Sequence, residues 1–389
     1  MKAAGSFGSR ACVRLARPGP VALFAAVLTL AAGTPAGAQS KGQRSYVPQY
    51  TLRAGRATPV GGLDWTPVLY PGCDANGNLY ARVLPGSVGP HMFTTPVTKF
   101  SSDGERKATF SLAAAPGWEQ GDFVDFTVGE DGMVYLLAER LAPHRKIDHA
   151  ILGFDRDGNL ALNAPLDFPV ASFDHIAAFS TGEFLVIAAR KTQAPPQQVP
   201  GTPTAAKRLQ NQEPDVEPIG FVVHGDGRLI QEVALPVSPL SVDKGKATGP
   251  PLVVSASSEQ GRAALVAGTD GNIYVMIAGG APFVYAISAA GEIVHSFAVK
   301  LPSPAYTPIG MMWAGGLGGL LIESAEIKNN GFSSSQTLLS VVDTTTGERI
   351  ADYHVGPELG TLPACFNQRH IYFLGSRDGK LVMREAEPR

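Results

Sequence analysis

The sequence predicts an all-β fold: a propeller of six blades, each blade a four-stranded antiparallel sheet. A short turn-and-strand phrase recurs about every 50 residues, a spacing typical of propeller blades. No sustained apolar stripe of helical period follows residue 38. Each unit holds two such phrases, and two hairpins make a four-stranded sheet. We therefore expect little helix and one β-propeller domain over residues 61–389.

The first phrase of each unit is a turn of Asp or Asn with Gly, followed by a strand of apolar residues. Glycine suits tight turns with positive φ, which Asn and Asp tolerate, and Tyr, Val, Ile and Leu favour strands. The second phrase ends in a similar turn. Copies of the first phrase lie at residues 74–80, 130–135, 180–185 and 269–274, with weaker copies at 318–321 and 367–372; copies of the second lie at 100–104, 154–158, 223–227, 287–291 and 342–347.

Counting the phrases gives blades near residues 62–116, 119–169, 172–237, 250–302, 305–358 and 361–389. The last unit is too short for four strands, whereas residues 45–53 have strand character and no unit of their own. Pairing this N-terminal strand with the last blade closes the ring and leaves no open sheet edge. The Pro/Gln-rich tract 193–218 is predicted to be a loop insertion, and a miscount near it would make the blades five or seven.

Residues 1–38 are predicted to be a signal peptide, and residues 39–60 an N-terminal segment with the closing strand. Four basic residues precede an apolar stretch over 21–30, and Ala36-Gly37-Ala38 supplies the cleavage pattern after Ala38. No other stretch is long and apolar enough to cross a bilayer. We therefore expect a secreted or periplasmic protein without a transmembrane span.

The balance of charge argues against two classes of partner. The chain holds 32 basic and 34 acidic residues, and cleavage would remove four basic residues and no acidic ones. An acidic chain lacks the basic footprint that nucleic acids and anionic membranes require. The expected partner is an unidentified protein or small-molecule ligand, and the chain is expected to be a monomer.

The phrases at residues 74–80 and 271–275, with the trailing Phe-x-x-Asp-Gly turns, resemble those of NHL-repeat and related six-bladed propellers. The resemblance covers residues 60–385 and implies the propeller architecture. It does not imply one activity, because such propellers include binding proteins, lyases, lactonases and scaffolds.

Cys73 and Cys365 occupy the same place in the first and last units, just ahead of the first hairpin. Ring closure makes these units neighbours, so in an oxidising compartment a disulfide between them would covalently link the first and last blades. The alternative is two buried free thiols. Two cysteines without a nearby histidine are poor evidence for zinc.

Candidate site residues follow from the propeller geometry, because the standard catalytic and nucleotide-binding motifs are absent from the sequence. Loops that lead into innermost strands, and loops that join second to third strands, gather on one face where ligands usually bind. The acid–base candidates there are Glu139, Asp174, His175 and Glu323. The ligand-binding candidates are Asp64, Trp65, Arg82, Trp118, Glu119 and Arg190.

Each candidate also has a structural interpretation. Arg82, Glu139 and Arg190 could form ion pairs between blades, which stabilise little. Trp65 and Trp118 could pack between blades, and His175 could be a hydrogen-bonded structural residue.

Three functions remain open at this point, and the third is a purely structural envelope component without a formed pocket. The first is a binding module that takes a protein, peptide or small envelope ligand through one propeller face, with no cofactor. The second is a lactonase-like hydrolase or a lyase that holds Ca²⁺ or Mg²⁺ at the mouth of the central channel; it would need several ligands that converge on one point.

Overall fold

Strands make up nearly all the regular structure of the computed structural model. It describes residues 46–66, 68–84, 93–143, 146–191, 216–235, 265–277, 282–328, 331–359, 362–367 and 370–387. Within these ranges there are 25 strands and no α-helix, and no helix there is long and apolar enough to span a membrane. The predicted signal peptide and its cleavage site, and residues 193–215 of the predicted insertion, lie outside them; residues 216–218 begin a strand.

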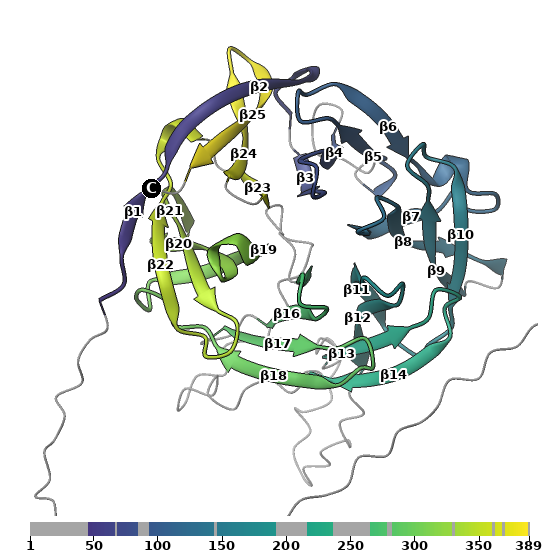
Figure 1. Cartoon of the computed structure of the whole chain (residues 1–389). Helices are drawn as coiled ribbons and strands as arrows, with labels where there is room; N and C mark the ends of the chain where they lie inside the picture. The colour runs from purple at the N-terminus through teal and green to yellow at the C-terminus, as the bar shows by residue number, and fades with distance from the viewer. Residues whose placement is uncertain are drawn as a thin grey trace, which may run out of the picture. The chain divides into compact units, whose positions relative to one another are not determined.

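The described strands form six sheets arranged as a ring, each with four antiparallel strands, so the predicted six-bladed propeller is confirmed (Figure 1). Blade one consists of β3 (Val68–Cys73), β4 (Leu79–Val83), β5 (Val97–Phe100) and β6 (Arg106–Phe110). Blade two consists of β7 (Asp122–Val128), β8 (Val134–Leu141), β9 (Ile147–Phe154) and β10 (Leu160–Leu166). Blade three consists of β11 (Ser172–Ala178), β12 (Phe184–Lys191), β13 (Val216–Val223) and β14 (Leu229–Ala234). Blade four consists of β15 (Leu265–Ala267), β16 (Ile273–Ile277), β17 (Phe283–Ile287) and β18 (Ile293–Ala298). Blade five consists of β19 (Tyr306–Ala314), β20 (Gly319–Lys328), β21 (Gly331–Asp343) and β22 (Arg349–His354). Blade six consists of β23 (Leu362–Asn367), β24 (His370–Arg377) and β25 (Lys380–Glu387), and β2 (Arg53–Asp64) completes it.

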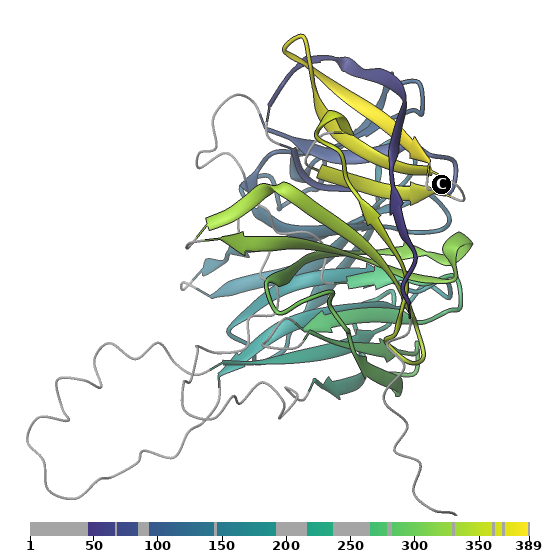
Figure 2. The ribbon, with the colours of Figure 1, turned by 90° about the vertical axis from the view of Figure 1, so that its left-hand side faces the viewer.

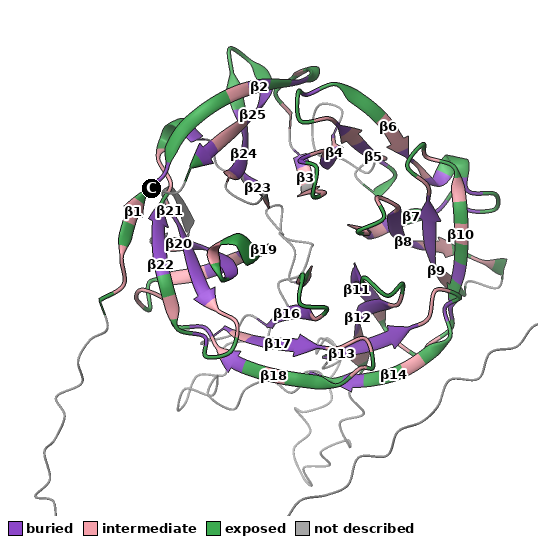
Figure 3. Ribbon diagram, viewed as in Figure 1, coloured by how far each residue is buried: buried purple, intermediate pink, exposed green. Residues whose placement is uncertain are grey.

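Six hydrophobic clusters hold the ring together, one at each junction between adjacent blades. At the junction of blades one and two, for example, Tyr80 and Phe110 pack with Phe123 and Phe154. The buried residues therefore lie on the facing surfaces of the sheets, while the outermost strands are partly exposed (Figure 3). Burial on both faces explains why the second strands read as continuous apolar runs.

An N-terminal strand closes the ring, as the sequence predicts. Strand β2 pairs antiparallel with β25, with Arg53 opposite Glu387, and Figure 2 shows the purple N-terminal strand beside the yellow C-terminal ones. The closing strand starts at Arg53, where the strand predicted over 45–53 ends. The preceding strand, β1 (Gln49–Thr51), instead pairs in parallel with β22 as a fifth strand of blade five.

Side chains fix β1 to blade five. Gln49 Nε2 donates to Asp352 Oδ2 over 2.7 Å, and Gln49 Oε1 lies 2.9 Å from His354 Nε2. Tyr50 stacks on Tyr353 with ring centroids 5.3 Å apart. These contacts attach a three-residue strand that would otherwise pair weakly.

A hydrogen bond within the first hairpin explains part of the repeated phrase. In blades one, two and four, a tyrosine hydroxyl of the second strand approaches an aspartate of the preceding turn. Tyr274 Oη donates to Asp270 Oδ2 over 2.6 Å, and Tyr80 Oη donates to Asp74 Oδ2 over 3.2 Å. Burial and the nearby Asp131 raise the pKa of the corresponding Tyr135 to about 12.

Five of the innermost strands carry β-bulges or irregular register. Register shifts occur in β3, β7, β11, β19 and β23, for example between Phe123 and Asp125 of β7 and between Pro308 and Gly310 of β19. A bulge bends its strand and re-aims the adjacent side chains. These bulges shape the wall of the space that the innermost strands surround.

Candidate functional site

A cavity of about 890 Å³ occupies the centre of the ring and is lined by residues from all six blades. Its wall consists of the innermost strands, and turns joining first to second strands line one end, including residues 74–76, 129–130, 268–269 and 315–316. A cavity of this volume can hold a drug-sized molecule. The lining turns join first to second strands, so they lie at the opposite end of the innermost strands from the loops that were predicted to bind a ligand.

The wall between the ends of the cavity is mainly apolar. Strand β7 contributes Phe126 and β23 contributes Phe366, while β19 contributes Met311, Met312 and Trp313. All of these except Met311 are only partly buried. Partly exposed aromatic and thioether groups offer a ligand apolar contact.

Trp313 is held in place by two neighbours. Its Nε1 donates to Thr269 Oγ1 over 3.2 Å. Its ring stacks on Tyr274, with centroids 5.4 Å apart, and Tyr274 is itself fixed by the turn aspartate. The indole is therefore preorganised, which reduces the entropy lost when a ligand packs against it.

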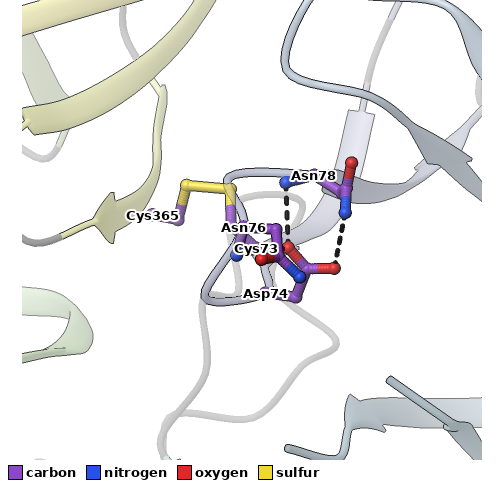
Figure 4. Close-up of a disulfide and its surroundings, with 5 residues drawn as sticks. All are labelled: Cys73, Asp74, Asn76, Asn78 and Cys365. Carbon is purple, nitrogen blue, oxygen red and sulfur yellow. Dashed lines mark hydrogen bonds between the residues drawn. A yellow bond between two sulfur atoms is a disulfide. The ribbon is translucent and has the colours of Figure 1, made fainter. Parts of the chain in front are cut away.

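Charged side chains line the cavity at the end formed by the turns and farther along the strands. The residues at the turn end are Asp74, Glu130, Lys99 and Arg156. Asp125 lies farther along, at the bulge of β7, and Glu323 lies opposite Gly310, beside the bulge of β19. The Asp74 carboxylate accepts hydrogen bonds from the backbone N–H groups of Asn76 and Asn78, and from Asn78 Nδ2 over 2.7 Å (Figure 4). Its role includes ordering the turn.

Asp125 joins blade two to blade three. Its Oδ2 accepts a hydrogen bond from the Ile176 N–H over 3.1 Å and lies 3.3 Å from His175 Nδ1. Asp125 and His175 are both buried. His175 is among the predicted site residues and Asp125 is not; the sequence signal for Asp125 is a carboxylate within residues 123–128, which are otherwise apolar except for Thr127.

Of the three other acid–base candidates, Asp174 and Glu139 lie outside the cavity and Glu323 lines it. Asp174 accepts a hydrogen bond from Ser172 Oγ over 3.1 Å, and burial raises its pKa against the opposing effect of His175. Glu139 Oε2 lies 3.6 Å from His149 Nε2, and neither residue lines the cavity. Glu323 is 1% exposed and does line it.

The predicted ligand-binding residues lie away from the cavity. Asp64 pairs with Lys380 over 2.6 Å, and Arg190 pairs with Glu232 over 2.6 Å. The Arg82 guanidinium packs over the Phe123 ring at 3.7 Å, between blades one and two. These contacts stabilise the scaffold.

The remaining three predicted ligand-binding residues lie in loops between blades. Trp65 is 44% exposed, and its backbone N–H donates to the Gly379 carbonyl over 2.8 Å. Trp118 is buried under the Arg140 guanidinium. Glu119 is exposed, and hydrogen bonds from backbone N–H groups lower its pKa.

The predicted disulfide is confirmed. Cys73 of β3 and Cys365 of β23 are bonded, with Cα atoms 5.6 Å apart, and both line the cavity (Figure 4). The bond links the innermost strands of the first and last blades, 292 residues apart in sequence. Within the described ranges, no three His, Cys, Asp or Glu side chains gather as a metal site.

No protein-family model matches the sequence, and no curated protein matches it. Similar solved structures include a protein of unknown function from Bacteroides caccae, with 12% identity over 78% of this chain and 96% of that chain and a TM-score of 0.41. Another is the Dos1 propeller, with 9% identity over 86% of this chain and 95% of that chain and a TM-score of 0.40. A third is a chain of a mitotic checkpoint complex, with 12% identity over 93% of this chain and 99% of that chain and a TM-score of 0.38. At such scores these similarities carry no argument about activity.

Proposed function

We propose that this protein is an exported binding module that takes a small ligand into the central cavity of its propeller. The observation that supports the proposal is the cavity itself: about 890 Å³, with an apolar wall contributed by every blade and a few charged groups. This combination of volume, apolar surface and sparse polar groups is typical of ligand pockets.

A variant that narrows the cavity tests the proposal. Ala267 is exposed and lines the cavity on β15, so Ala267→Trp should place an indole in the cavity and reduce its volume without disturbing the buried core. Ala161→Trp, at an exposed position on the outermost strand β10, is the matched control. After incubation with an envelope extract and gel filtration, mass spectrometry should find a compound that wild type and Ala161→Trp retain equally and that Ala267→Trp retains less. Identical compound profiles for all three proteins would contradict cavity binding.

Export is the second part of the proposal. It is supported by the basic and apolar segments of residues 1–38 and the Ala36-Gly37-Ala38 pattern. The disulfide is consistent with an oxidising compartment. Expression of the full chain in a bacterial host should give a periplasmic or secreted protein whose first residue is Gln39; an intact N-terminus in the cytoplasmic fraction would contradict it.

We further propose that the blades are of the NHL-repeat type. The support is the pair of phrases at residues 74–80 and 271–275, each a turn with Asn and Gly that leads into a strand with tyrosine. The architecture is compatible with this assignment and with related six-bladed propellers.

A further inference from the structure

We propose that the cavity selects a ligand with a planar aromatic ring, and that this ring stacks on the indole of Trp313. The inference rests on the proposed function, because it specifies the chemical class of the ligand that the same cavity takes. It follows from the position of the indole in the wall, from the contacts that fix it and from the glycine beside it.

Trp313 faces the cavity although it belongs to a junction between blades. It lies near the end of β19 and packs against the hydrophobic cluster between blades four and five, yet it is only partly buried and lines the cavity. Trp118, which packs into the cluster between blades one and two, is buried by contrast. Packing between blades therefore does not account for the exposed part of the Trp313 indole.

The contacts of the indole determine which part of it faces the cavity. Tyr274 of blade four stacks on one face, with ring centroids 5.4 Å apart and ring planes at 21°. Because Tyr274 is fully buried while Trp313 is partly exposed and lines the cavity, the indole lies between this tyrosine and the cavity. The polar atom Nε1 already donates to Thr269 Oγ1 over 3.2 Å. The surface left for a ligand is therefore the opposite ring face and its rim, which are apolar.

A single turn of blade four fixes both rings of this stack. Thr269 and Asp270 follow each other in the turn between β15 and β16. Thr269 accepts the hydrogen bond from the indole, and Asp270 Oδ2 accepts one from Tyr274 Oη over 2.6 Å. A ligand ring would extend an ordered two-ring stack by one more ring. Aromatic rings attract one another in offset-stacked pairs, and a preorganised platform reduces the entropy lost on binding.

Glycine at position 315 leaves room for the indole. The three atoms nearest to a Cβ there, apart from its chain neighbours, would all belong to the Trp313 ring, and the nearest, Nε1, would be 2.7 Å away. Gly315 does not have a positive φ, so its backbone conformation does not require glycine. Gly315 also lines the cavity. The missing side chain therefore lets the indole occupy its place, and no side chain at this position comes between the rim of the indole and a ligand.

Other parts of the wall also suit an aromatic ligand. Met312 and Phe366 line the cavity and pack against the cluster between blades five and six. Phe126 lines it from β7, and β7 and β19 lie on opposite sides of the ring (Figure 1). Thioether sulfur atoms and aromatic rings both make favourable contacts with a further aromatic ring. The wall therefore offers an aromatic ligand a kind of contact that a saturated ligand of the same size does not gain.

Two uncharged probes of similar size test the preference: 2-naphthol, which is aromatic and flat, and decahydro-2-naphthol, which is saturated and puckered. Binding of each probe to the mature protein is measured by ligand-observed NMR titration. Stacking should make 2-naphthol bind about fivefold or more tightly. The saturated probe has the larger apolar surface, so a merely apolar cavity would bind it equally well or better. Equal affinities, a preference for decahydro-2-naphthol, or no binding of 2-naphthol would overturn the inference.

Variants assign the preference to Trp313. Trp313→Leu should weaken 2-naphthol binding about fivefold and change decahydro-2-naphthol binding less than about twofold, because leucine keeps apolar contact and removes the ring face. Trp313→Phe, which keeps a ring, should retain most of the preference. Trp65→Leu, at a half-exposed tryptophan outside the cavity, is the matched control and should change neither affinity. Equal weakening of both probes by Trp313→Leu would indicate a general loss of packing and would contradict stacking.

Wild-type protein provides a second readout if Trp313→Leu does not fold. The chain holds three tryptophans, which are Trp65, Trp118 and Trp313, so protein with ¹⁵N-labelled indole groups gives three side-chain resonances. Trp65→Leu and Trp118→Phe each remove one resonance and leave the third as that of Trp313. Bound 2-naphthol should shift the Trp313 resonance through its ring current and leave the other two unchanged. A Trp313 resonance that does not move when the probe is bound would overturn the assignment.

The outcomes separate this inference from the proposed function. If both probes bind equally and Ala267→Trp weakens both, the cavity is a ligand site and only the aromatic preference is wrong. If wild type retains a compound from the envelope extract better than Ala267→Trp does, and that compound has no aromatic ring, the same conclusion follows. Failure of the proposed function itself would appear as identical compound profiles for wild type and Ala267→Trp.

Discussion

Removal of the Cys73–Cys365 disulfide should be the most destabilising change that leaves the hydrophobic clusters almost intact. The bond closes a loop of 292 residues. In the chain-entropy model, a loop of this length reduces the entropy of the unfolded chain by an amount that stabilises the fold by about 5–6 kcal/mol. Unfolding entropy for about 340 residues is roughly 0.7 kcal/mol per degree, so the loss corresponds to a Tm lower by about 8 °C.

The assay is thermal unfolding of the mature protein, followed by circular dichroism and calorimetry. The Cys73→Ala/Cys365→Ala variant and reduced wild type should show the same lowered Tm, because both lack the cross-link. Reductant should leave the Tm of the double variant unchanged, which controls for effects of the reductant itself.

A decrease of less than about 2 °C in the double variant would refute this reasoning. It would mean that the unfolded chain keeps the first and last blades close without the bond. A decrease in the variant without one in reduced wild type would instead identify lost packing at the two side chains as the cause.

Three further comparisons have expected outcomes. Arg82→Ala should lower the free energy of unfolding, measured by denaturant titration, by about 3 kcal/mol, because the guanidinium is buried between blades. Arg190→Ala breaks a surface ion pair and should lower it by less than about 1 kcal/mol. Equal decreases for the two variants would contradict this expectation. Tyr274→Phe should cost about 1 kcal/mol through its lost hydrogen bond to the turn carboxylate, and Tyr46→Phe, at an exposed ring, should cost nothing measurable. Hydrogen bonds led by the Thr345 hydroxyl lower the pKa of Asp343 to about 2, so its ionised form stabilises the fold at pH values above 3.8, an effect that disappears as the pH falls through about 2. The Tm difference between wild type and Asp343→Asn should therefore narrow from pH 5 to pH 2.5, and a constant difference would contradict it.

The architecture could be predicted because it depends on short sequence patterns at the hairpin turns. Each hairpin turn needs a residue that tolerates positive φ, and Gly77, Gly132, Gly182 and Gly271 provide it in successive blades. The periodic spacing of such turns predicts six blades without knowledge of any contact between distant residues, and the long gap at the insertion left five or seven as alternatives. The disulfide followed by the same logic, because ring closure alone makes the first and last units neighbours.

The site was harder to predict because it depends on contacts that cross between blades. Arg82 and Glu323 are both charged residues of second strands, yet Arg82 packs over Phe123 of the next blade, whereas Glu323 lies in the middle of β20 and lines the cavity. Which of them contacts a neighbouring blade and which lines the cavity depends on adjacent strands, and this leaves no local sequence pattern. Asp125 was missed for the same reason, since its partners lie on β11 in the next blade.

The pairing of Arg53 with Glu387 brings the two ends of the closing blade together. Strands β25 and β2 are antiparallel, so a short turn from Glu387 to Arg53, in a chain that omits β1 and the residues before it, would make them one continuous hairpin. New chain ends could then be placed between β2 and β3, next to Thr66, at the boundary of two blades. In such a circular permutant, every blade would be built from consecutive strands, and the disulfide would still join the first and last blades of the new chain.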